Sequence, residues 1–239
     1  MQSPVALLAL GTLVFLYGSA AAEPASVQPP ILSLTDVELA ERIGFLEQRL
    51  DEARPTALTW QWGWTGAYTA SFVFNLDYAI RVDDNDRRVR AVVAAAKSAV
   101  AAVQTARLWH DPLVATQGAR PMREVPGEGR AAEEQRLAVG ESLLLTSAEQ
   151  AETRYSLQRH LIVIGGNLLG GAAILALGDG GDALWSTLIG VGVGETQIWT
   201  QPWRAGSDLR DYDGEFGGTA TASIAALPAG AGLQLAVRF

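Results

Sequence analysis

The sequence has 239 residues, of which 49% are hydrophobic, with a formal net charge of -8 and no cysteine. The acidic balance argues against nucleic acid as a partner, because a phosphate backbone requires clustered Lys and Arg. The lack of cysteine excludes disulfides, thiolate metal sites and a cysteine nucleophile, and the length favours one domain with short appendages.

Residues 1–22 have the features of a signal peptide. An apolar run from Val5 to Tyr17 is followed by three alanines before Glu23, which fits the A-x-A cleavage rule. An uncleaved anchor is the alternative, although the run is short for a span, which needs about 20 apolar residues. We therefore expect an exported chain in the periplasm or inner membrane of a bacterial envelope, with the outer membrane less favoured. Residues 23–34 are Pro-rich and read as a linker, and residues 35–239 as a single helical domain.

The first helix of that domain is predicted from Thr35 to about Ala53. Thr35 and Glu38 form a capping-box pattern, and apolar residues then recur on one helix face. Pro55 follows this helix and precedes the next segment, residues 59–82.

Residues 59–82 alternate between apolar and mostly small or polar side chains, which is typical of a β-strand. A membrane barrel needs at least about eight strands, however, and only the C-terminal end, about 219–239, reads as strands, in the form of a hairpin. A period of two also contains i,i+4 ridges, one starting at Trp60 and another at Trp62. We predict a helix with apolar ridges on two sides, buried at the centre of a bundle.

Further along the chain, residues 89–109 are Ala-rich and predict a helix, and residues 110–129 predict a loop with several prolines. A long polar helix over 130–160 can run directly into the apolar segment 161–178, which a turn at 179–182 joins to a second apolar segment, 183–203. The fold class predicted is mainly α: a helical bundle around this Gly-rich helical hairpin, with a small C-terminal β-hairpin.

Two interpretations of the Gly-rich hairpin stay open. Segment 161–178 has the minimum length for a membrane span, and arginines outside the hairpin oppose its acidic turn, as the positive-inside rule expects. Glu195 argues against a span, because a carboxylate in the bilayer is costly. A soluble or peripheral bundle is equally compatible. In either case two G-x-x-x-G patterns allow close helix approach and offer a route to an oligomer, through Gly166, Gly170, Gly190 and Gly194.

No nucleophile elbow, phosphate-binding loop or His-based zinc motif is present in the sequence, so no catalytic residue, metal or cofactor is predicted. Four polar residues lie inside apolar segments instead: Asp77, Lys97, Asn167 and Glu195. Because buried charges must be paired or neutralised, we predict that they form a buried polar cluster and a binding site. A purely structural ion-pair network, or outward-facing side chains, would also explain them.

Trp199 and Trp203 flank Pro202 at the end of the second apolar segment. Tryptophan favours membrane and protein interfaces alike, so this pair is a candidate interface, unless it packs the end of the bundle.

The function expected from the sequence is an exported, non-enzymatic envelope protein that acts through contacts with the membrane or with an envelope protein. The alternative is a small membrane transport or channel component that uses the buried polar residues. A third hypothesis, from a different class, is an enzyme in which Glu195 or Asp77 serves as acid or base.

Overall fold

The computed structural model describes residues 34–106, 113–217, 221–226 and 233–238. The signal peptide predicted for residues 1–22 lies outside the described residues, as does all of the linker except Leu34, and both stay predictions.

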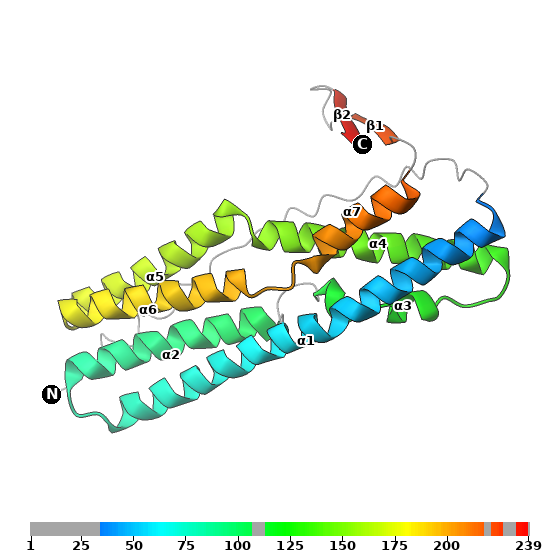
Figure 1. The fold of residues 1–239 in the computed structure, drawn as a ribbon. Coiled ribbons are helices and arrows are strands. Elements are labelled where there is room, and N and C mark those ends of the chain that lie inside the picture. The colour runs from blue at the N-terminus through cyan, green and yellow to red at the C-terminus, as the bar shows by residue number, and fades with distance from the viewer. Residues whose placement is uncertain (1–33, 107–112, 218–220, 227–232, 239) are drawn as a thin grey trace. The chain divides into compact units, whose positions relative to one another are not determined.

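The described chain is mainly helical (Figure 1). Its helices are α1 (Asp36–Arg81), α2 (Asn85–Ala106), the 3-10 turn η2 (Val114–Thr116), α3 (Arg120–Arg123), α4 (Arg130–Arg154), α5 (Leu157–Leu177), α6 (Gly180–Trp199) and α7 (Arg204–Phe216). Two strands, β1 (Thr221–Ala226) and β2 (Leu233–Arg238), pair antiparallel. Since residues 218–220, 227–232 and 239 are outside the described part, the hairpin predicted for about 219–239 remains a prediction.

Helix α1 begins with the predicted capping box. The Thr35 hydroxyl accepts from the Glu38 N–H at 3.2 Å, and the Glu38 carboxylate accepts from the Thr35 N–H at 2.8 Å. The prediction that this helix ends near Ala53 is wrong, because α1 continues through Pro55 to Arg81. An interior proline costs roughly 3 kcal/mol, but both halves of α1 pack against other helices, and this packing offsets the cost.

The two halves of α1 have different neighbours. Its first half packs with α4 and α7, and its second half packs along α2, which in turn contacts the α5–α6 hairpin (Figure 1). The Arg90 guanidinium, on α2, pairs with the Asp182 carboxylate, on α6, at 2.7 Å, so the α1–α2 connection and the α5–α6 turn lie at the same end.

The helical prediction for residues 59–82 is confirmed, but the predicted burial on two sides is wrong. The first part of the Trp60 ridge faces the bundle: the Trp60 indole donates to the Gln197 carbonyl at 3.2 Å, and the Trp64 indole donates to the Thr200 hydroxyl at 3.1 Å. Its last two members, Leu76 and Ile80, are exposed. The other ridge is exposed, with Trp62 at 59% and Phe74 at 70% of full exposure. An apolar pattern indicates that one face of a helix is hydrophobic, but it does not indicate whether other helices or something else covers that face.

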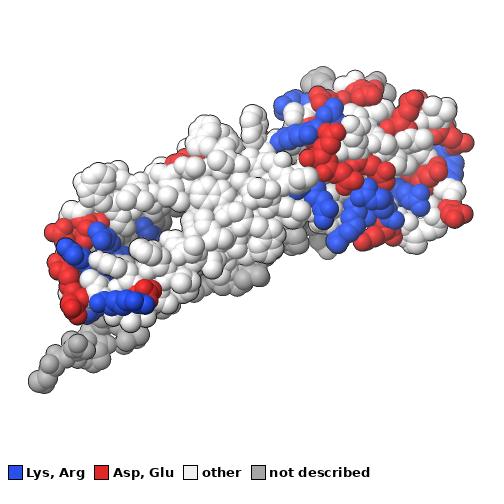
Figure 2. All heavy atoms as spheres, turned by 60° about the horizontal axis from the view of Figure 1, so that its bottom comes forward, with Lys and Arg blue, Asp and Glu red and all other residues white. Residues whose placement is uncertain are grey.

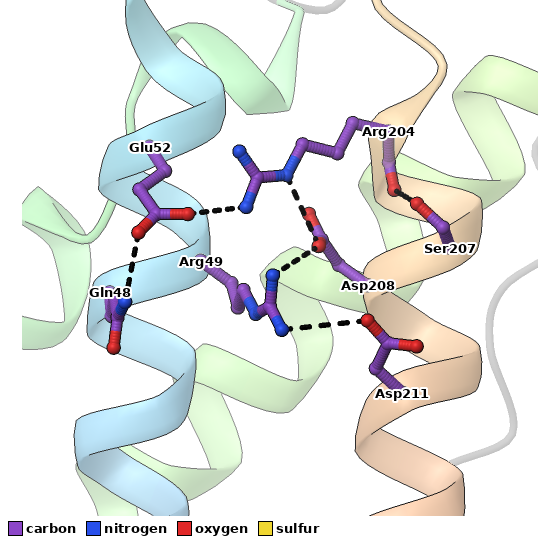
Figure 3. A network of polar contacts seen from close by, with 7 residues as sticks. All are labelled: Gln48, Arg49, Glu52, Arg204, Ser207, Asp208 and Asp211. Carbon is purple, nitrogen blue, oxygen red and sulfur yellow. Dashed lines mark hydrogen bonds and ion pairs between the residues drawn. The ribbon is translucent and has the colours of Figure 1, made fainter.

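Helix α7 was not predicted from the sequence, because its face toward α1 carries charge. A network of ion pairs and hydrogen bonds connects it to α1 (Figure 3). The buried Asp208 carboxylate lies 3.3 Å from the Arg204 Nε and 3.5 Å from an Arg49 nitrogen, and Arg204 also pairs with Glu52 of α1. Burial raises the pKa of Asp208 above its usual range, although Arg204 and Arg49 lower it.

Aromatic rings pack beside this network. The Phe45 ring, on α1, meets the Tyr212 and Phe216 rings, on α7, at centroid distances of 5.7 and 5.5 Å. Ring contacts of this kind add about 0.5–1.5 kcal/mol each beyond the burial of their area. Together with the ion pairs they fix α7 against the first half of α1.

The connection from η2 to α3 docks on α1 through Asp51. Its carboxylate accepts from Arg123 at 2.8 and 3.2 Å and from the Ala119 N–H at 2.9 Å, and these bonds hold the pKa of Asp51 below its usual range. Gly118 has a φ of 60°, and an added Cβ there would lie 2.7 Å from the Asp51 carboxylate. Glycine is therefore required at this approach.

Candidate functional site

Lys97 lies inside the bundle formed by α2, α5 and α6. Its ammonium donates to the Asn167 side-chain oxygen at 3.1 Å, to the Ser186 hydroxyl at 3.3 Å and to the Ser186 carbonyl at 3.4 Å. The Asn167 amide in turn donates to the Val163 carbonyl at 2.9 Å. Three acceptors match the three N–H groups of the ammonium, so the charge is solvated by neutral oxygens from two helices.

Two of the four predicted site residues, Lys97 and Asn167, therefore lie together. Asp77 lies apart from them, more than half exposed, and pairs with Arg81 one turn along α1 at 2.7 Å. The Glu195 carboxylate is hydrogen-bonded to the His160 Nδ1 at 2.6 Å. The predicted cluster is thus three separate polar contacts in the structure.

Glycines allow the helices to approach closely around Lys97. An added Cβ at Gly170 would lie 3.0 Å from the Lys97 side chain, and one at Gly190 would collide with the Asn167 side chain. Gly194 packs in the same way against Val163. Gly166 is the exception, with no atom within 4 Å of the added Cβ. Three of the four glycines predicted to form an oligomer face thus serve contacts within this chain.

Replacing Gly190 with alanine is expected to lower the free energy of unfolding by about 1–3 kcal/mol, because Asn167 and Lys97 must both move. Gly192, on the same helix with nothing within 4 Å of an added Cβ, is the matched control. Gly192→Ala is expected to be neutral or to stabilise by up to about 1 kcal/mol through helix propensity. Thermal unfolding of the purified full chain measures both, and equal effects would contradict the packing described here.

Sequence reasoning missed other polar contacts inside the bundle. The Tyr68 hydroxyl donates to the Gln197 side-chain oxygen at 3.0 Å, and the Gln197 amide donates to the Thr105 hydroxyl at 3.1 Å. The Ser71 and Ser98 hydroxyls lie 2.9 Å apart. These residue types are too common to stand out in a sequence.

His160 was also missed, because its contact with Glu195 depends on the register of the α5–α6 hairpin. The Tyr155 ring packs edge-on against the imidazole at 6.1 Å and against the Trp199 ring at 5.0 Å. Trp199 and Trp203 of the predicted interface are both well exposed.

Among the described residues, no group of three or more His, Asp or Glu side chains is placed to hold a metal ion. The most extensive surface feature is apolar. Figure 2 shows charged side chains gathered at two ends of the molecule, with an almost uncharged band between them. Phe74, Leu168 and Leu188 are among the many large apolar side chains that are exposed on α1, α5 and α6.

Two described helices, α2 and α5, are long and apolar enough to cross a membrane by length and composition. The core helix of a soluble protein can meet the same criterion, but such a helix is mostly buried. Within the apolar 18-residue stretches of α2 and α5 that meet this criterion, only 22% and 11% of the residues are buried inside the bundle.

No family model, curated protein or solved structure matches this chain.

Proposed function

We propose that this chain is an integral membrane protein of the cell envelope, in which the second half of α1 together with α2, α5 and α6 crosses the bilayer. In this proposal it acts through contacts with the membrane and with a protein partner, and it is not an enzyme. The uncharged band of exposed apolar side chains around a polar interior is the observation that carries the proposal.

The polarity of this bundle is inverted relative to a bundle in water. Phe74 and Leu188 are exposed, whereas Lys97, Ser98 and Asn167 face other helices. Exposed apolar patches beyond a few hundred Å² are rare on monomeric soluble proteins. Polar groups that bond across helices are the expected interior of a membrane bundle.

The lengths of the helical ranges that carry at most one charged residue support the same proposal. Residues 55–76 carry no charge, residues 91–106 carry only Lys97, residues 161–177 carry none, and residues 183–203 carry only Glu195. At 1.5 Å per residue these ranges are about 24–33 Å long, close to the roughly 30 Å of a bilayer hydrocarbon core.

Exposed tryptophans lie toward the ends of these ranges, as aromatic belts do in membrane proteins. Trp185 follows the acidic turn, and Trp62, Trp199 and Trp203 lie toward the other end. The predicted Trp199–Trp203 interface is then a contact with lipid headgroups.

The helices outside the band supply the surface proposed for a protein partner. The first half of α1, with α4 and α7, is held together by side-chain ion pairs such as Arg49–Asp208 and Arg204–Glu52. The hairpin of about 219–239 would extend this part of the chain.

A second candidate is a membrane transport or channel component. The observation that favours it is Lys97, an ammonium in the middle of the band whose hydrogen bonds go to neutral oxygens. Charged residues inside membrane bundles commonly mark ion or substrate pathways. Solute flux into vesicles that contain the full chain, and its loss in Lys97→Met, would favour this candidate over the first.

Alkaline carbonate extraction tests the proposed membrane location. We expect the full chain to stay in the membrane pellet and to require detergent for release. Release into the supernatant by carbonate alone would overturn the proposal and leave a peripheral bundle.

A further inference from the structure

A small cavity with both polar and apolar lining residues lies where α2 ends, α5 begins and α6 ends. Its volume is about 120 Å³, well above the roughly 10–15 Å³ that one water molecule needs. Its polar lining comes from Gln104, Thr105, Arg154, Arg159, Gln197 and Gln201. Gln104 is exposed and therefore lies at the mouth, while Gln201 is only 3% exposed and lies deep.

The lining of this cavity is positively charged. It contains two arginines and no Asp or Glu among its residues. The Arg154 guanidinium lies over the Trp60 ring, 5.7 Å from its centroid, so an aromatic face orients this cation. A planar guanidinium presents paired N–H donors that match the oxygens of a phosphate group.

Gln201 supplies an independent observation. Its side-chain amide nitrogen is buried and has no hydrogen-bond partner among the described residues. A buried donor without an acceptor is uncommon in proteins, and it indicates an oxygen-bearing ligand or water. Here the unsatisfied donor belongs to a residue that lines the same cavity as the two arginines.

We infer that this cavity binds a phosphate-bearing anion, which in a membrane is the headgroup of an anionic phospholipid. The choice of a lipid rests on the proposed membrane location. Arg154 and Arg159 lie just beyond the uncharged range that begins at Leu161, where the lipid phosphates would be, and Trp199 and Trp203 lie near the same boundary. The two arginines and the Gln201 amide donate to the phosphate oxygens.

The test measures the melting temperature of the full chain in mild detergent with added phosphatidylglycerol, phosphatidylcholine or inorganic phosphate at matched ionic strength. We expect phosphatidylglycerol to raise the melting temperature and phosphatidylcholine not to do so. Arg159→Gln is expected to weaken the apparent affinity about tenfold, because it removes one charge-assisted contact. Gln201→Met should weaken it less and serves as a second variant if Arg159→Gln folds poorly.

Arg210→Gln is the matched control, because Arg210 is an exposed arginine on α7 that does not line the cavity. It should keep the full response. A response to inorganic phosphate equal to that with lipid, and lost in Arg159→Gln, supports the anion site with free phosphate as its source. The measurement with inorganic phosphate does not depend on the proposed membrane location. No response to either anion, or a response that both cavity variants keep, would overturn the inference.

Discussion

Replacing Asp208 with alanine is expected to lower the free energy of unfolding by about 2–3 kcal/mol. Its carboxylate is 2% exposed and bridges Arg204 and Arg49 between α7 and α1 (Figure 3). Removal takes away the buried acceptor that joins the two arginines, which then keep only their more exposed partners, Asp211 and Glu52, and it also leaves the space of the carboxylate unfilled. At 2–4 °C per kcal/mol for a chain of this size, the melting temperature should fall by about 4–12 °C.

Replacing Asp208 with asparagine keeps the shape of the side chain and removes its charge. Because burial raises the pKa of Asp208, the neutral form is favoured in the folded state relative to the unfolded state, and Asp208→Asn should stay within about 1 kcal/mol of the native chain. For the same reason, the stability that Asp208 contributes should fall as the pH rises from the unfolded-state value of about 3.9 through its raised pKa.

Asp211→Ala is the control for the network. Asp211 pairs with the same Arg49 at 3.5 Å, but its side chain is 55% exposed, so we expect a loss below about 1 kcal/mol. Equal losses for Asp208→Ala and Asp211→Ala would show that burial of the carboxylate is not what makes Asp208 important.

Replacing Leu168 with arginine is expected to reduce severalfold the amount of full chain recovered in the membrane fraction. Leu168 lies mid-way along α5 and is 57% exposed. In a bilayer, arginine at the centre of a span costs about 2.5–3.5 kcal/mol. On a surface in water, the same change alters stability by only about 0.5 kcal/mol. Quantitative immunoblotting of the washed membranes measures the difference.

The control is the same substitution outside the band. Val37, near the start of α1, is 67% exposed and lies well before Pro55. Val37→Arg should leave recovery unchanged, and Leu168→Met should do the same. If Leu168→Arg also left recovery unchanged, the exposed apolar band would not face lipid.

Local sequence patterns correctly predicted those helical segments whose formation depends on neighbouring residues in the sequence. The Thr35 cap and the helix over residues 59–82 follow from capping chemistry and from i,i+4 ridges. The continuation through Pro55 did not follow, because packing on both sides outweighs the local cost of proline. Helix α7 was missed because Asp208 is buried by its arginine partners, which lie on α1 and on α7 itself.

The candidate site was only partly predictable for a similar reason. Lys97 and Asn167 could be paired from their apolar surroundings. Asp77 could not be excluded, because its local partner Arg81 and its exposed position depend on which face of α1 is covered. The contact between Glu195 and His160 requires the register of the α5–α6 hairpin, which the apolar pattern alone does not fix.

The most direct test of membrane insertion is labelling by a membrane-impermeant maleimide, in membranes opened to both sides. The chain has no cysteine, so each introduced cysteine is the only thiol. Leu188→Cys lies in the band on α6 and Val37→Cys lies outside it, and both positions are exposed in the structure. If the band lies in lipid, Leu188→Cys reacts only after denaturation in detergent, because the reactive thiolate does not form in hydrocarbon, while Val37→Cys reacts at once. Equal and immediate labelling of both variants would contradict insertion.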